Sequence, residues 1–192
     1  MRSRYTDRFT ALIDACVLGG ALRRNLLLSL AEAGLFRPRW SARILDETQK
    51  AISEITNGET DGSHQRAAIE AAFPEAVVNG FEAIEKTLKL PDPNDNHVLA
   101  AAITISASVI VTDNLSDFPA DILAPHEIEA ISADSFIADT FTLDPIEAIQ
   151  ALKRMRERLK SPGLDATALV RKAEAQGLLQ VATLMDEYQS FL

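Results

Sequence analysis

The segment that most constrains the fold is residues 108–112, whose sequence SVIVT is apolar at each central position. A strand without alternation of polar and apolar residues is typical of a parallel sheet that helices cover on both faces. Residues 9–14 form a second short buried strand by the same criterion, and residues 76–78 and 128–131 are further strand candidates. Because helical segments separate these strands, the sequence predicts an α/β sandwich with a mainly parallel central sheet.

The helical segments show apolar residues at a spacing of three and four. Residues 22–33 carry leucines on one face and precede Gly34, which ends the predicted helix. Residues 35–40 are expected to form a loop. Ser41 then stands where a side chain caps a helix that continues to about residue 55.

The pattern changes at Asp144. This residue is followed by Pro145 and, at the third helical position, Glu147, a combination that favours a helix start. Further apolar positions at helical spacing continue to residue 191, with Gly177 as a possible break. We therefore predict an α/β domain at residues 1–142 and an all-helical C-terminal extension at residues 143–192.

Composition narrows the cellular context and the partners. No apolar run approaches the roughly 20 residues that span a bilayer, and the single cysteine, Cys16, excludes an internal disulfide and fits a reducing compartment. We expect a cytoplasmic protein without a membrane anchor. The formal net charge of −9 argues against nucleic-acid binding through overall charge, although a local basic strip can still serve.

Four acidic residues from distant parts of the chain are predicted to meet at one edge of the sheet. Asp14 follows the first strand, Asp113 follows residues 108–112, Asp95 precedes the helix that leads to that strand, and Glu47 lies on the helix after Ser41. Ligands of parallel sheets bind beyond the carboxyl ends of the strands. Carboxylates crowded there repel one another unless a cation intervenes. Mg²⁺ or Mn²⁺ suits such oxygen ligands, and no histidine or cysteine cluster favours zinc.

The order of these segments resembles the PIN-domain ribonucleases, in particular the VapC-like toxins of type II toxin–antitoxin systems. The likeness covers roughly residues 8–142 and rests on the segments LIDACVL, WSARILDE, DPNDNHVLAAA and ASVIVTDNLSDFP. It implies a three-layer PIN-like sandwich and metal-dependent hydrolysis of RNA phosphodiester bonds. It also implies that Asp14 and Asp95 bind the metal ion directly, while Glu47 and Asp113 complete the catalytic and metal-binding set.

The fourth acidic position departs from the family pattern. The family's acid aligns most naturally with Asn114, which adds no negative charge. Asp113 or Asp117 can supply the charge instead, and Thr112 is placed to support a carboxylate or the substrate through a hydrogen bond.

An acidic ribonuclease still needs cationic groups near its substrate. Arg37, Arg39 and Arg43, with Trp40 among them, form the nearest candidate strip, because arginine binds phosphate and an aromatic ring stacks on a base. Trp40 has a competing interpretation as a core residue. A second basic cluster occupies residues 153–160, where a solvated helix face is the simpler interpretation. The resemblance further implies an antitoxin as protein partner, and a homodimer is plausible.

Two other interpretations stay open at this point. One is a PIN-fold RNA-binding or housekeeping nuclease-like module that does not act as a toxin, which Asn114 favours. The other is a receiver-like or HAD-like phosphoryl-transfer domain. A HAD-like phosphatase requires two acids one residue apart after the first strand, whereas Asp14 is followed by Ala15 and Cys16.

Overall fold

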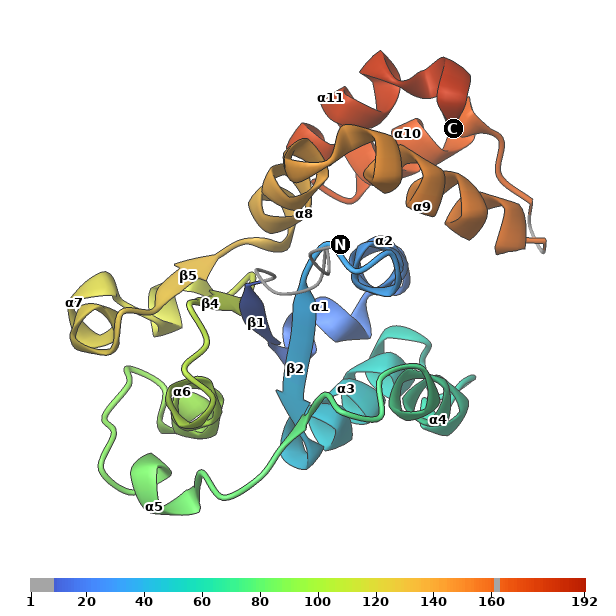
Figure 1. Cartoon of the computed structure of the whole chain (residues 1–192). Coiled ribbons are helices and arrows are strands. Elements are labelled where there is room, and N and C mark those ends of the chain that lie inside the picture. Colours follow the sequence, from blue (N-terminus) through green and yellow to red (C-terminus); the bar gives the residue numbers. More distant parts are fainter. Residues whose placement is uncertain (1–8, 161–162) are drawn as a thin grey trace. The chain divides into compact units, whose positions relative to one another are not determined.

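The computed structural model of the 192-residue chain describes residues 9–160 and 163–192. Residues 1–8, which the sequence assigns to the α/β domain, lie outside the described part. By its internal contacts the chain divides into two compact units (Figure 1). The sheet unit comprises residues 9–21 and Arg37–Ser132, and the helical unit comprises Leu22–Phe36 and Ala133–Leu192.

The sheet unit is built on five parallel strands in the order β3-β2-β1-β4-β5. The central strand is fully buried at Ala11, Leu12 and Ile13, as a strand covered on both faces must be. This arrangement confirms the predicted α/β class with a parallel sheet. The strands are β1 (Thr10–Ile13), β2 (Arg37–Ser41), β3 (Val77–Val78), β4 (Val109–Val111) and β5 (Glu129–Ile131).

Strand β2 corrects the loop expected at residues 35–40. Arg37, Pro38 and Arg39 together look like a surface connection, but this segment pairs with β1 on one side and β3 on the other. Pro38 and Trp40 are buried, whereas Arg37 is exposed and Arg39 is partly so. Alternate residues of the strand face the core and a more open side. The two arginines lie on the more open side, which is why the sequence did not indicate a strand.

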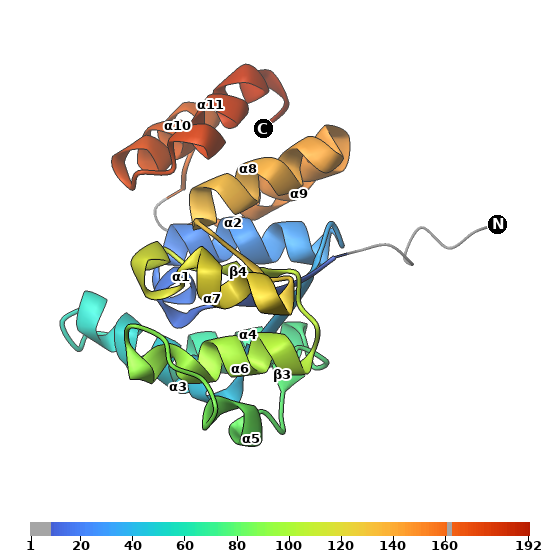
Figure 2. The ribbon, with the colours of Figure 1, turned by 90° about the vertical axis from the view of Figure 1, so that its left-hand side faces the viewer.

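Helices α3 and α6 lie on the same face of the sheet in both views (Figures 1 and 2). Helix α6 contacts β1 and β4 through an unbroken buried stretch, His97–Ala102, in which three consecutive alanines permit close packing on the sheet. The α-helices of the sheet unit are α1 (Ala15–Gly19), α3 (Ala42–Ile55), α4 (Ser63–Ala72), α5 (Glu82–Glu85), α6 (Asn96–Thr104) and α7 (Ala120–Leu123). Short 3₁₀ turns occupy Pro93–Asp95, Leu115–Asp117 and Ala124–His126.

The helical unit confirms the predicted C-terminal helices. It also contains the helix predicted at residues 22–33 and a helix at Ala133–Leu143. Asp144 caps its helix by accepting a hydrogen bond from the Glu147 N–H at 3.1 Å, and Gly177, with φ of 78°, separates the last two α-helices. Its core includes Phe36, whose ring meets that of Phe136 edge-on at 4.9 Å. The helices are α2 (Ala21–Glu32, of which Ala21 belongs to the sheet unit), α8 (Ala133–Leu143), α9 (Pro145–Arg158), α10 (Ala166–Ala175), α11 (Leu179–Glu187) and a 3₁₀ turn, Gln189–Phe191.

The domain boundary predicted after residue 142 stays a prediction, because contacts do not show whether either part folds alone. By contact, α2 and α8 group with the C-terminal helices. Within residues 9–160 and 163–192, no helix combines the length and the apolar character needed to cross a bilayer.

Ser41 begins α3 as the sequence predicted, since its buried Oγ accepts the Ile44 N–H at 3.1 Å. Replacing it by alanine leaves that N–H unpaired in a buried place, and we expect Ser41→Ala to lower the free energy of unfolding by about 1–2 kcal/mol. Urea denaturation followed by circular dichroism measures this. Ser190→Ala, at an exposed position, should stay within about 0.5 kcal/mol of wild type, and equal effects in both variants would contradict the capping role.

Candidate active site

Asp14 stands at the carboxyl end of the central strand, where it is only 5% exposed. Its Oδ1 accepts the Ala15 N–H at 2.6 Å, and its Oδ2 accepts the Thr112 hydroxyl at 2.8 Å and the Cys16 thiol at 3.1 Å. The Asp14 N–H in turn donates to the Val111 carbonyl, which ties the residue to the end of β4. Burying a carboxylate is costly unless donors compensate for lost hydration. These donors fix the carboxylate in one orientation.

The Cys16 thiol is a donor to this carboxylate and no nucleophile. Burial, together with the negative charge of Asp14, raises the pKa of the Cys16 thiol to about 12. A thiol reacts as the thiolate, which is therefore absent at neutral pH.

Asp95 ends the 3₁₀ turn before α6 and is half-buried. The pKa of its carboxyl group is raised to about 6. Burial is the largest cause, and the negative charges of Asp14, Asp92 and Asp117 contribute to the same rise. Asp14 and Asp95 are 81 positions apart in sequence, so their mutual repulsion shows that the fold brings them together. The role of these two carboxylates as direct metal ligands stays a prediction.

Glu47 occupies a separate ion-pair cluster on α3. Its Oε1 lies 3.2 Å from His97 Nε2 and 3.5 Å from Arg43 Nε, while Arg43 Nη1 also contacts Glu85 at 2.8 Å. The imidazole of His97 is 1% exposed. It links the Glu47 carboxylate to the start of α6, two residues after Asp95. His97 is thus packed in the core, and it also orients Glu47.

The candidates for the fourth position follow β4. Asp113 and Asn114 are exposed, and their backbone N–H groups donate to Cys16 Sγ at 3.4 Å and Thr112 Oγ1 at 3.1 Å. Asp117 is half-buried, and its charge contributes to the raised pKa of Asp95. Asp117 is therefore close enough to act on Asp95 electrostatically, and the choice of Asp113 stays a prediction.

The metal set as a whole also stays a prediction. Within the described residues, no group of three or more histidine, cysteine, aspartate or glutamate side chains is close enough together to hold a metal ion. The donor chemistry nevertheless fits a hard divalent cation, because Asp14 and Asp95 offer carboxylate oxygens whose repulsion a cation would relieve.

The structure overturns the proposed role of Trp40 in stacking on an RNA base. Its side chain is fully buried and meets Phe73 edge-on, with ring centroids 5.8 Å apart. Alternation along β2 turns Trp40 into the core, away from the face that carries Arg37 and Arg39. The RNA-binding role of Arg37, Arg39 and Arg43 stays a prediction.

The PIN domain family matches residues 10–116, more than half of the chain, and the matched segment contains Asp14, Glu47 and Asp95. The chain belongs to the PIN domain family. This membership confirms the resemblance read from the sequence and excludes the receiver-like and HAD-like alternatives.

Two further matches concern VapC proteins. The family described as the VapC50 C-terminal domain matches residues 133–187, which is the segment of α8 to α11. A protein of Mycobacterium tuberculosis (strain ATCC 25618 / H37Rv) named "Putative ribonuclease VapC50" is 51% identical over 49 residues, which is 26% of this chain and 29% of that protein. The match therefore spans less than a third of the relative. No solved structure matches the chain.

Thr112 provides the first test of the site. We expect Thr112→Val, which keeps the shape but removes the donor to Asp14 Oδ2, to lower the free energy of unfolding by about 1.5–3 kcal/mol, as for hydrogen bonds to charged groups. Urea denaturation at pH 7 measures the loss. Thr112→Ser retains the hydroxyl and serves as the control. A valine variant as stable as the serine variant would show that the hydrogen bond does not support the carboxylate.

Asp95 provides the second test, through pH. Its folded-state pKa of about 6 lies above the ordinary value of 3.8. Between these values the folded state binds more protons than the unfolded state, so stability falls as pH rises. We expect this fall from pH 4 to pH 6.5 to be smaller in Asp95→Asn, measured by denaturation in EDTA. Asp121→Asn, an exposed control, should follow wild type. If the stability of all three proteins changes with pH to the same extent, the repulsion acting on Asp95 is refuted.

Proposed function

We propose that this chain is a metal-dependent endoribonuclease that hydrolyses RNA phosphodiester bonds, and that it acts as the toxin of a toxin–antitoxin pair. The observation that carries the proposal is the buried, donor-fixed Asp14 at the carboxyl edge of the central strand, together with Asp95, whose pKa is raised to about 6 by burial and by the charge of Asp14. Membership of the PIN family and the name of the mycobacterial relative support the activity.

Asp14 and Asp95 would hold the divalent ion, Mg²⁺ or Mn²⁺, with Asp117 or Asp113 nearby. When bound, such an ion supplies a water of lowered pKa and neutralises charge that develops on the phosphoryl oxygens. The chain contributes orientation: Thr112, Cys16 and the Ala15 N–H aim the Asp14 carboxylate.

The remaining groups act on charge and position. Asp95 gives up its proton more readily when a cation offsets the charges of Asp14 and Asp117. Glu47 is held by His97 from the start of α6 and by Arg43 on its own helix. Because the Cys16 thiol keeps its proton, attack by water without a covalent enzyme intermediate is the reaction that these groups fit.

The partners in this proposal are single-stranded or folded RNA as substrate and a cognate antitoxin protein, with the cytoplasm as the place of action. A homodimer is compatible with the proposal. The match to the mycobacterial ribonuclease covers 49 residues and supports this proposal.

Asp14→Asn and Asp95→Asn test the activity. We expect each to reduce Mg²⁺-dependent cleavage of a fluorescent single-stranded RNA by at least about 100-fold, because each removes a carboxylate on which the ion depends. Asp139→Asn, at an exposed position on α8, is the matched control and should cleave like wild type, and circular dichroism verifies folding.

Two outcomes would contradict this. Undiminished cleavage by either site variant would show that the assigned carboxylates are wrong. Binding of RNA by wild type without cleavage in Mg²⁺ or Mn²⁺ would identify a PIN-fold binding module in place of a nuclease.

A further inference from the structure

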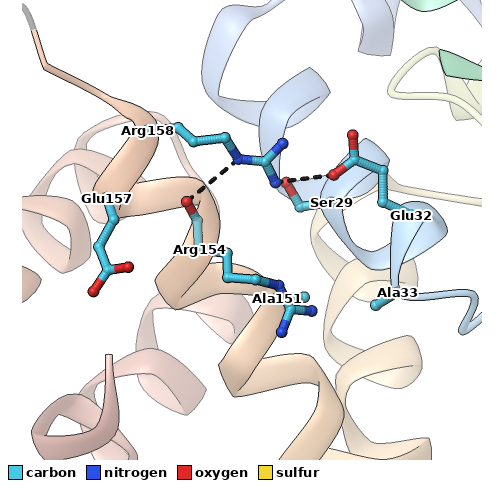
Figure 3. Close-up of a pocket in the computed structure, with 7 residues that line it drawn as sticks. All are labelled: Ser29, Glu32, Ala33, Ala151, Arg154, Glu157 and Arg158. Carbon is cyan, nitrogen blue, oxygen red and sulfur yellow. Dashed lines mark hydrogen bonds and ion pairs between the residues drawn. The ribbon is translucent and has the colours of Figure 1, made fainter.

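The helical unit contains a groove between α2 and α9 (Figure 3). Its volume is about 540 Å³. The floor is formed by small side chains, and arginines from α9 stand over it. The lining residues are Ser29, Glu32, Ala33, Ala151, Arg154, Glu157 and Arg158.

The α9 wall of this groove belongs to a basic segment in a chain of net charge −9, while the lining itself sets Arg154 and Arg158 against Glu32 and Glu157. The segment KRMRERLK, residues 153–160, carries five basic residues against Glu157 alone. Cations in the last turn of a helix stabilise it by offsetting its dipole, which explains Arg156 and Arg158. Lys153 and Arg154 precede that turn, so helix stability does not account for them.

The two arginines of the groove are held by weak partners. Arg158 Nη2 lies 2.9 Å from Glu32 Oε2, and Arg154 Nη2 lies 3.2 Å from Glu147 Oε1. About half of each arginine side chain is exposed, and surface ion pairs of this kind break at little cost. Glu157 points away from the guanidinium group of Arg158 (Figure 3).

Arg156 differs from this pair. Its side chain is 20% exposed and its Nη1 donates to the Leu164 carbonyl at 3.1 Å, so it holds the chain after α9 in place. Arg154 and Arg158 are four residues apart, about 6 Å along the helix, and therefore present their guanidinium groups on the same side. A planar guanidinium binds a phosphate through two parallel hydrogen bonds.

We propose that this groove binds the phosphodiester backbone of single-stranded RNA, with Arg154 and Arg158 contacting phosphates and releasing Glu147 and Glu32. The inference rests on the proposed function, which supplies RNA as the polyanion. A linear polyanion fits better than an acidic peptide, because the basic residues follow the helix axis and the groove floor of alanines and Ser29 offers no deep apolar pocket for a peptide anchor. An RNA contact on the helical unit would allow an acidic protein to bind its substrate.

The test measures binding apart from cleavage. Fluorescence anisotropy of a labelled single-stranded RNA in EDTA gives the Kd as a function of salt for the full chain. Each phosphate contact on a single strand contributes about 0.7 to the slope of log K against log salt. We expect Arg154→Ala/Arg158→Ala to lower the slope by about 1.4 and the affinity by about 25-fold at 0.1 M salt.

Arg171→Ala/Lys172→Ala on α10 is the matched control, because both residues are exposed and the change in net charge is the same. It should retain the wild-type slope. Glu32→Gln removes the competitor for Arg158 and should tighten binding about five-fold at 0.1 M salt. Circular dichroism confirms that each variant folds.

The inference is overturned if the groove variant has the same affinity and slope as the control variant. That result, together with wild-type cleavage of RNA in Mg²⁺, leaves the proposed function intact. If the groove residues contribute to RNA binding in EDTA but no cleavage occurs in Mg²⁺, the RNA-binding surface is supported and the proposed nuclease activity is refuted.

Discussion

The hydrogen bond between Thr112 and Asp14 joins the ends of two neighbouring strands, and the site depends on it. Without donors, a carboxylate that is 95% buried at the end of the central strand would be a large cost to the fold. The Thr112 hydroxyl, the Cys16 thiol and the Ala15 N–H compensate for that cost, and each lies within three residues of a strand end. The geometry of a parallel sheet therefore places the acid and its donors together.

The placement of Asp95 close to other carboxylates lowers the stability of the fold. Its pKa of about 6 means that the folded chain holds a partly buried carboxylate against the charges of Asp14, Asp92 and Asp117. A structural network would relieve such repulsion with an arginine or lysine. His97 offsets part of this repulsion, and the pKa of Asp95 nevertheless stays raised. Perturbed pKa values of this kind cluster at functional sites.

Local patterns in the sequence were sufficient for the elements whose cause is local. The Ser41 cap, the Asp144 cap and the break at Gly177 were predicted because each depends on a few adjacent residues. Strand β2 was not, because Arg37-Pro38-Arg39 has the composition of a loop and only pairing with β1 and β3 makes it a strand. The burial of Trp40 confirms the core interpretation that competed with base stacking. The contact of Glu47 with His97 joins residues 50 positions apart. No spacing rule could indicate that contact.

The two units are interleaved along the chain, which bears on how each can be studied. Helix α2 follows β1 in sequence by only a few residues, yet by contact most of it groups with the C-terminal helices. Arg23 donates to the Gln176 carbonyl at 2.8 Å, and Glu32 pairs with Arg158, 126 residues away. Four leucines of α2 are buried, namely Leu22, Leu26, Leu27 and Leu30. Removing the C-terminal helices would expose that apolar face in the middle of the remaining chain. A loss of RNA binding or cleavage after truncation would then report unfolding as readily as function, so substitutions in the full chain are the informative experiment.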